Sequence, residues 1–234
     1  MFAGHYAASF ALKRANPRIP LWLLFIAVQF IDVLWAVFIL LGIEKARVVP
    51  GLPGSPLNLY YMPYTHSLIG ALAWAALAYV AFRLLPSRSG VQRATVALIL
   101  AVGVFSHYVL DLIVHRADMA LWDNTAKIGL GLYNFAWIAY ALEAVLLVGG
   151  LWLYLRATTA TTFGGRYGMI IFVAVLLLVN VAAYAVAPQN IQVAAIFNEV
   201  CYWVFAGIAL WLDRQRRPIE APAAPMPGPR RARS

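Results

Sequence analysis

Charged residues are scarce in this chain of 234 residues: 12% are Asp, Glu, Lys or Arg, while 63% are hydrophobic. A soluble domain has about a quarter of its residues charged, so this chain could not cover a folded surface with polar groups. Cysteine is nearly absent, and the single Cys201 excludes an internal disulfide. No cleavable signal peptide is expected, because Lys13 and Arg14 follow the first apolar stretch instead of preceding it. The composition predicts an integral membrane protein.

Six apolar stretches are long enough to cross a bilayer, which requires about 20 helical residues. They are residues 20–42, 63–85, 92–115, 128–155, 167–187 and 190–212. A shorter helix is expected at 2–14, closed by the prolines of "ANPRIP", and it could lie on the membrane surface or re-enter as half of a hairpin. We therefore expect an all-α, polytopic membrane helix bundle of six spans plus a short N-terminal re-entrant or interfacial helix, with the transmembrane domain over residues 1–213.

Basic residues are shared unevenly between the two sides of such a bundle. With six spans, fourteen of the eighteen Lys and Arg residues fall on one side. The positive-inside rule then places this side, and both termini, in the cytoplasm. Residues 214–234 are rich in Pro and Arg and are expected to form a disordered basic tail beside the bilayer. This tail lacks the interleaved aromatic residues of a nucleic-acid platform, so the expected partner is the lipid bilayer and not nucleic acid.

One expected span carries three ionisable residues at intervals of four. The segment "SHYVLDLIVH" (106–115) contains His107, Asp111 and His115, which lie along one face of a helix. An i, i+4 pair is the spacing by which one helix offers two ligands to one metal, although by itself it also fits a structural hydrogen bond. His115 is as compatible with a solvated position at the end of the helix as with the site.

Other ionisable residues fall at a similar depth, about 18–27 Å from the basic end of their helices at the rise of an α-helix. The layer contains Asp32, His66, His107, Asp111, Glu143 and Glu199, and His5, about 12 Å from Lys13, comes near it if its helix re-enters. A buried charge costs ~2.5–3.5 kcal/mol in a bilayer, which favours a cluster that shares a cation over scattered charges. A mixed set of His and Asp suits Zn²⁺, Mn²⁺ or Fe²⁺ better than Ca²⁺ or Mg²⁺, and one or two ions could be held.

Four segments of this layer resemble a known family: "GH" at 4–5, "QFID" at 29–32, "PYTHSL" at 63–68 and "SHYVLDLIVHRADM" at 106–119. They are similar to the bacterial integral-membrane, metal-dependent hydrolases of the LexA-regulated type. "GLGLYN" at 129–134 and Glu143 are similar to a branch often labelled as hypothetical proteins or permeases. The resemblance covers roughly residues 1–156, and the last two spans carry no matching motif.

The resemblance implies a location in the bacterial inner membrane and a metal site formed by His5, Asp32, His66, His107 and Asp111. Zinc is the expected metal, with manganese or iron as alternatives. The usual acidic motif of the family is Pro-Asp-x-Asp, whereas this chain has "FIDVLW" and keeps one aspartate, which leaves a second metal open.

Three functions are compatible with this layer. In the hydrolase implied by the resemblance, a metal-activated water attacks an ester or phosphoester of an amphiphilic, lipid-like substrate, with Glu143 or His115 as general base or acid. Arg116 and Lys127 lie on the outer side and could contact a phosphate. The alternative is a permease or an ion- or proton-coupled transporter, but the apolar cytoplasmic halves of the spans favour a one-sided site. The third is a structural protein whose polar layer only fixes helix packing.

Overall fold

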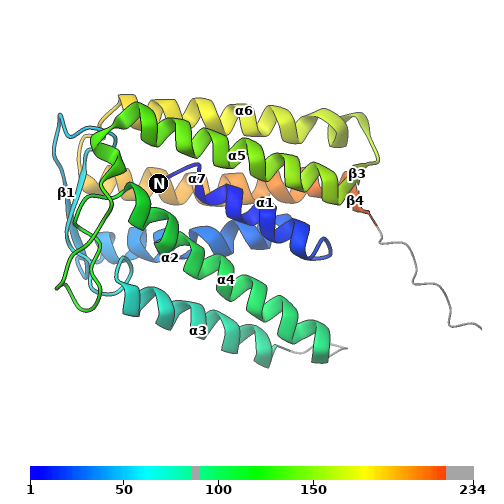
Figure 1. Cartoon of the computed structure of the whole chain (residues 1–234), viewed down its shortest axis with the longest axis horizontal. Coiled ribbons are helices and arrows are strands. Elements are labelled where there is room, and N and C mark those ends of the chain that lie inside the picture. Colours follow the sequence, from blue (N-terminus) through cyan, green and yellow to red (C-terminus); the bar gives the residue numbers. More distant parts are fainter. Residues whose placement is uncertain (86–89, 220–234) are drawn as a thin grey trace, which may run out of the picture.

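The structure is a computed structural model that describes residues 1–85 and 90–219, and these form a bundle of seven α-helices (Figure 1). The helices are α1 (His5–Ala15), α2 (Leu21–Leu40), α3 (Leu68–Leu84), α4 (Gly90–Val114), α5 (Ala136–Ala157), α6 (Phe163–Ala185) and α7 (Ile191–Asp213). Two short antiparallel pairs, β1 (Lys45–Val48) with β2 (Leu57–Tyr61) and β3 (Thr158–Ala160) with β4 (Arg216–Pro218), lie at opposite ends of the bundle. In Figure 1, α1, α2 and α7 lie between the α5–α6 pair and the α3–α4 pair.

Within the described ranges, five helices are long and apolar enough to cross a membrane: α2, α4 over Arg93–Val114, α5, α6 and α7. The chain therefore has the character of a membrane protein. α3 is also apolar, but its 17 residues are fewer than those of the other five.

Two helices begin later than the sequence pattern predicts. α3 begins at Leu68 and not at residue 63, because the Ser67 side chain accepts a hydrogen bond from the Gly70 amide and so caps the helix. α5 begins at Ala136 and not at residue 128, because Gly131 has a left-handed backbone with φ of 73° and a 3₁₀ turn, η1 (Leu132–Asn134), precedes the helix. In both cases the residues before the helix form irregular chain at the end that carries β1 and β2.

The short helix α1 lies inside the bundle and not on its surface. His5, Tyr6 and Phe10 are fully buried, and α1 packs against α5, α2 and α4. Contact with α5 is close at Gly150, where a Cβ atom would lie 2.9 Å from the Cα of Ala7. Of the two placements expected for residues 2–14, the structure has the one within the bundle.

The basic end of the bundle is the end that carries Lys13, Arg18 and Arg156. α1 runs from the interior towards this end, so the amino end of the chain lies inside the bundle. Met1 is 5% exposed and its α-amino group contacts Asp111. The expectation that both termini lie on the basic side rested on the charges of Lys13 and Arg14, which lie at the opposite end of α1 from Met1.

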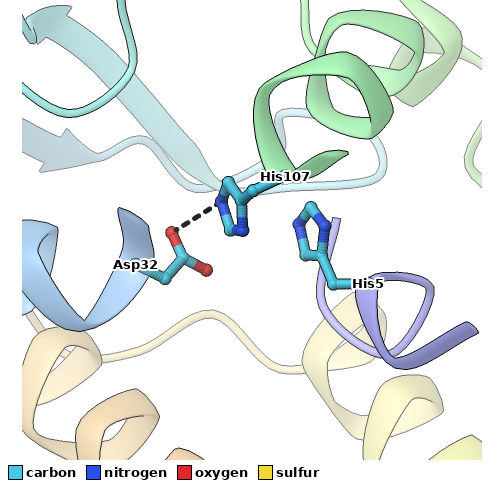
Figure 2. Close-up of side chains that lie close together, drawn as sticks. All are labelled: His5, Asp32 and His107. Carbon is cyan, nitrogen blue, oxygen red and sulfur yellow. Dashed lines mark ion pairs between the residues drawn. The ribbon is translucent and has the colours of Figure 1, made fainter. Parts of the chain in front are cut away.

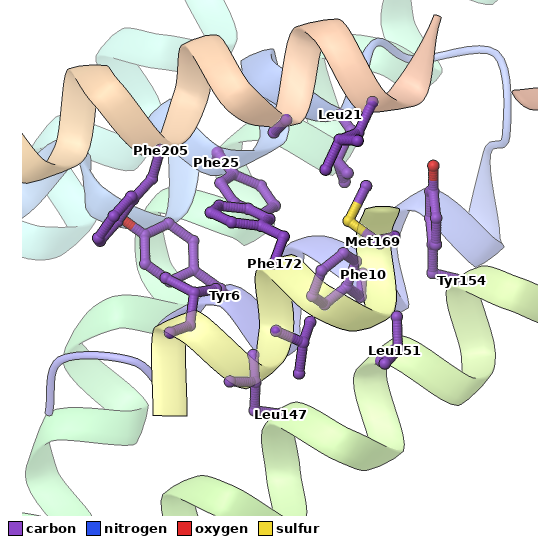
Figure 3. Close-up of a cluster of buried hydrophobic side chains, with 14 of the residues drawn as sticks. Tyr6, Phe10, Leu21, Phe25, Leu147, Leu151, Tyr154, Met169, Phe172 and Phe205 are labelled. Carbon is purple, nitrogen blue, oxygen red and sulfur yellow. The ribbon is translucent and has the colours of Figure 1, made fainter. Parts of the chain in front are cut away.

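An apolar cluster fills the bundle between α1, α2, α5, α6 and α7 (Figure 3). Aromatic rings dominate it: Tyr6 and Phe25 lie with ring centroids 4.5 Å apart, and Phe10 contacts Phe25 at 5.6 Å. Phe172 and Phe205 close the cluster from α6 and α7. This packing holds α1 between four longer helices.

A polar network ties α1 to the rest of the bundle at the basic end. The Lys13 ammonium group donates hydrogen bonds to Asp213 at 2.8 Å and to the Ile19 carbonyl at 2.8 Å. Asp213 also accepts from the Tyr154 hydroxyl at 3.0 Å and from the Leu21 amide at 3.0 Å. Strand β4 follows, inside the stretch expected to be a tail. Residues 220–234, which make up most of that stretch, lie outside the described residues.

Candidate metal centre

Four histidines and two aspartates meet inside the bundle, close to the end covered by β1 and β2. They come from α1, α2, the segment before α3, and α4 with the residue that follows it: His5, Asp32, His66, His107, Asp111 and His115. All are buried except Asp32, which is half-buried. The structure thus brings together all five residues expected as metal ligands. Figure 2 shows three of them, with His107 between Asp32 and His5.

Two histidines face the same two carboxylates. His66 Nε2 lies 3.3 Å from Asp32 Oδ1 and 3.5 Å from Asp111 Oδ2. His107 Nε2 lies 3.4 Å from Asp32 Oδ1 and 3.2 Å from Asp111 Oδ2. Ligand atoms on a tetrahedral zinc ion, with bonds of 2.0–2.1 Å, are roughly 3.3–3.4 Å apart. All four distances are close to this value.

The other ring nitrogen of each of these histidines is held by an acceptor. His107 Nδ1 lies 2.8 Å from the Val28 carbonyl oxygen, which fixes it as the protonated nitrogen. His66 Nδ1 lies 2.9 Å from Thr65 Oγ1, and the Thr65 hydroxyl in turn donates to Glu44 Oε2 at 2.5 Å. Both rings therefore present Nε2 to Asp32 and Asp111, and in the neutral imidazole this atom carries the lone pair.

This donor set fits a divalent transition metal. His107 Nε2 is fully buried and forms no hydrogen bond with any residue in the described part of the chain. In the neutral imidazole its lone pair faces two carboxylates, an arrangement that a cation between them would stabilise. Two overlapping groups, His5–Asp32–His107 and His66–His107–Asp111, have ligand atoms within 4.8 Å of one another and could hold a metal ion.

The second oxygen of Asp111 faces a different set of groups. Asp111 Oδ1 lies 3.1 Å from His5 Nε2 and 3.8 Å from His115 Nε2, and it also contacts the α-amino group of Met1. His115 is 8% exposed, and its Nδ1 lies 3.1 Å from Asp118 Oδ1. His115 is thus at the edge of the cluster, oriented by a carboxylate, and not a solvated residue beyond it.

Glu143, expected as a general base or acid, has a different environment. Its Oε2 accepts hydrogen bonds from the Phe2 and Gly4 amides at 3.1 and 2.9 Å, and its Oε1 accepts from the Tyr184 hydroxyl at 2.9 Å. Glu143 is fully buried and is not part of the wall of the cavity beside the cluster. Its contacts hold the segment that leads into His5.

Sequence reasoning missed contributions from the last two helices. Tyr202 of α7 donates a hydrogen bond to Asp32 Oδ2 at 2.8 Å, and Tyr184 of α6 binds Glu143. Depth counting along α7 singled out Glu199, but its carboxylate accepts from Trp203 on the same helix at 2.7 Å. The depth of Tyr202 along α7 could have identified it as a neighbour of Asp32. Counting only ionisable side chains left it out, because tyrosine carries no charge. Glu44 was also missed, since it lies in the outer connection.

A cavity of about 510 Å³ adjoins the cluster and is lined by Asp32, His66, Asp111 and His115 at its inner end. The segment that contains β2 and the turn before it also lines the cavity, with Gly54, Ser55, Pro56, Leu57 and Leu59. A Cβ atom at Gly54 would lie 2.6 Å from the Tyr133 carbonyl oxygen, so the loop packs tightly on the segment before α5. Trp35 closes the wall next to His66, with ring centroids 6.4 Å apart.

The two outer cations expected to contact a phosphate bind the protein itself. The Arg116 guanidinium group donates to the carbonyl oxygens of Pro53 and Ser55. The Lys127 ammonium group donates to the carbonyl oxygens of Leu59 and Tyr60 at 3.2 and 2.8 Å. Burial lowers the pKa of Lys127, against the opposing effect of Asp118. Both cations fasten the β1–β2 segment over the cavity.

Comparison of the chain with protein-family models, with curated proteins and with solved structures finds no match in any of the three.

Proposed function

We propose that the chain is a membrane-embedded, metal-dependent hydrolase that acts on an ester or phosphoester of an amphiphilic substrate. The observation that carries the proposal is the convergence of the His66 and His107 Nε2 atoms on Asp32 and Asp111, with both Nδ1 atoms held by acceptors. This arrangement is typical of histidines that bind a metal. Zinc suits the set best, with manganese or iron as alternatives.

In the membrane we place six spans, with α3 as the shortest, and the basic end of the bundle in the cytoplasm of a bacterial inner membrane. The basic end carries Lys13, Arg18 and Arg156, while Lys45 and Arg116 lie at the end with β1 and β2. The positive-inside rule supports this orientation. The cluster then lies in the outer half of the membrane.

The reaction follows from the groups around the cavity. A bound divalent metal would lower the pKa of a water molecule towards 7 and so supply a nucleophile near neutral pH. His115 would be the proton acceptor and donor for such a reaction, because it lines the cavity and Asp118 holds its Nδ1. The Tyr202 hydroxyl holds Asp32 in place. Glu143 positions residues 2–5 and takes no part in proton transfer.

Transport has less support from the same geometry. A permeation route would have to pass from the cluster to the Lys13–Asp213 pair at the basic end. The described side chains between them belong mainly to the cluster of Figure 3, including Phe10, Phe25 and Leu151. These large apolar groups are close-packed and offer few ligands to an ion.

The first test is metal content. Detergent-purified protein should contain about one equivalent of transition metal per chain, and His66→Ala and His107→Ala should lose it. Ser106→Ala is the matched control, because its hydroxyl donates to the Gly103 carbonyl of the same helix and not to a residue of the cluster. A metal content below about a tenth of an equivalent, unchanged by either histidine substitution, would refute the proposal.

The second test is turnover. The metal-loaded protein is incubated with mixed bacterial lipids, and released head groups and fatty acids are measured. His115→Ala should keep its metal and lose about 10²- to 10⁴-fold in rate, as expected for loss of a general base. If metal-loaded wild type releases neither product, the hydrolase assignment fails while the metal site stands.

A further inference from the structure

The cavity beside the cluster continues as an apolar channel between the end of α6 and the start of α7. Its walls there include Val179, Ala183 and Val186 on one side and Val193 and Phe197 on the other. Val186 is 67% exposed and Phe197 is 56% exposed although both line the cavity. The channel therefore opens sideways between two helices that are long and apolar enough to cross a membrane.

Among the polar side chains of this wall, which include Tyr184, Asn198 and Tyr202, Asn180 has the most unusual environment. Asn180 of α6 is 0% exposed and lines the cavity, yet neither its Nδ2 nor its Oδ1 has a hydrogen-bond partner in residues 1–85 and 90–219. Buried polar groups without a partner are rare because they are costly, and each requires an explanation. A side chain of similar size without polar atoms, such as leucine, would fit this wall at no such cost.

We propose that this channel takes the hydrocarbon chain of a membrane amphiphile, and that Asn180 binds the polar junction between the chain and the head group. A carboxamide both donates and accepts, so the ligand carries a hydroxyl or amide group beside its chain. The head group then points to the inner end of the cavity, where Asp32 and Asp111 lie. Asn180 is a specificity-determining residue, and the ligand enters from the bilayer without leaving it.

The residues around the opening of the channel indicate which class of molecule enters it. Its exposed apolar side chains lie on helices of membrane-spanning character, where the neighbouring molecules are lipids. A volume of about 510 Å³ lies in the range of pockets that enclose small ligands, ~300–1,000 Å³. An amphiphile in the bilayer would arrive with its chain already in the apolar phase. The reaction at the inner end rests on the proposed function, whereas binding in the channel does not.

The test uses a lysolipid with an ether-linked chain that carries a diazirine, because an ether cannot be hydrolysed at the site. Protein in lipid nanodiscs is irradiated with this probe, and labelled peptides are identified by mass spectrometry. Label is expected in the segments 179–186 and 193–202. Ala194→Trp, which fills the cavity from a buried position, should reduce it at least about tenfold. Gly207→Trp is the control on the same helix, since nothing lies within 4 Å of a Cβ atom there.

Asn180→Leu provides a second variant that does not depend on blocking the cavity. Because it removes an unpaired buried amide, its thermal midpoint without the probe should rise, while labelling should fall at least about fivefold. Absence of label from both segments in the wild type, or equal label in Ala194→Trp and Gly207→Trp, would overturn the proposal. So would full labelling of Asn180→Leu. Metal content is measured in the same samples, so a failure of the metal site is recognised separately.

Discussion

The imidazole rings of His5 and His107 stack face to face, with ring centroids 3.8 Å apart and planes 9° from parallel. The two rings come from α1 and α4 and meet at Asp111, but they face different oxygens of it: His5 Nε2 faces Oδ1 and His107 Nε2 faces Oδ2. His5 therefore covers the side of the cluster opposite to His66. Its ring contributes packing to the site in addition to any bond to a metal.

His5→Phe separates these two contributions, because phenylalanine keeps a stacking ring and removes the nitrogen atoms. We expect the metal affinity to fall by about 10- to 100-fold, while His107→Ala loses the metal altogether. Competition with a chelator of known affinity measures this. Complete loss of metal from His5→Phe would show that His5, and not the His66 side of the cluster, holds the ion.

Thr65→Val tests the hydrogen-bond chain from His66 to Glu44. Valine matches the shape of threonine but cannot accept from His66 Nδ1, so the ring loses its orientation and its basicity. We expect a metal affinity about 10- to 100-fold lower with an unchanged fold. Ser106→Ala, next to His107, should have no effect in the same competition assay. An affinity equal to wild type in Thr65→Val would show that the chain does not orient His66.

Glu143→Gln and Glu143→Ala distinguish positioning from proton transfer. Glutamine keeps an oxygen for the Phe2 and Gly4 amides and can donate to the Tyr184 oxygen, so metal content and turnover should stay within about threefold of wild type. Alanine leaves two buried amides unpaired and should cost about 1–3 kcal/mol of stability together with ordering of His5. A fall of about 100-fold in turnover in Glu143→Gln, with metal retained, would instead identify Glu143 as a general base.

Gly150→Leu tests the contact between α5 and α1. A side chain at Gly150 meets the backbone of Ala7, so α1 must shift, at a cost of about 1–3 kcal/mol, and the His5 side of the cluster is disturbed. Gly149→Leu is the neighbouring control, because nothing lies within 4 Å of a Cβ atom at that position. Thermal unfolding in detergent and metal content should change in the first variant only. Equal effects in both would contradict the close packing of α1.

The residues of the cluster could be predicted from the sequence because they lie at similar depths in the membrane. The rise of an α-helix per residue converts a residue's position in the sequence into this depth. Asp32, His66 and His107 were placed in this way from separate spans, and they meet in the structure. Depth does not give the direction in which a side chain points. Glu143 has a depth similar to that of the cluster, but its hydrogen-bond partners are Phe2, Gly4 and Tyr184.

The outer connections could not be predicted in the same way. Arg116 and Lys127 lie at the end of the bundle that carries β1 and β2, and their partners are backbone carbonyls of a loop whose path depends on tertiary packing. Glu44 supports His66 from the same irregular region through Thr65. Residues outside helices have no regular periodicity by which such contacts could be inferred.

The enclosure of α1 bears on the order in which the protein can be assembled. Eleven residues of helix reach about 16 Å, roughly half of a bilayer core, so α1 is not held across the membrane on its own. The groups that fix it come from later in the chain: Gly150 and Glu143 of α5, and Asp213 at the end of α7. His5 is synthesised first among the clustered residues, whereas these groups are synthesised later. The enclosure of α1 is therefore complete only when α5 and the end of α7 have packed against it.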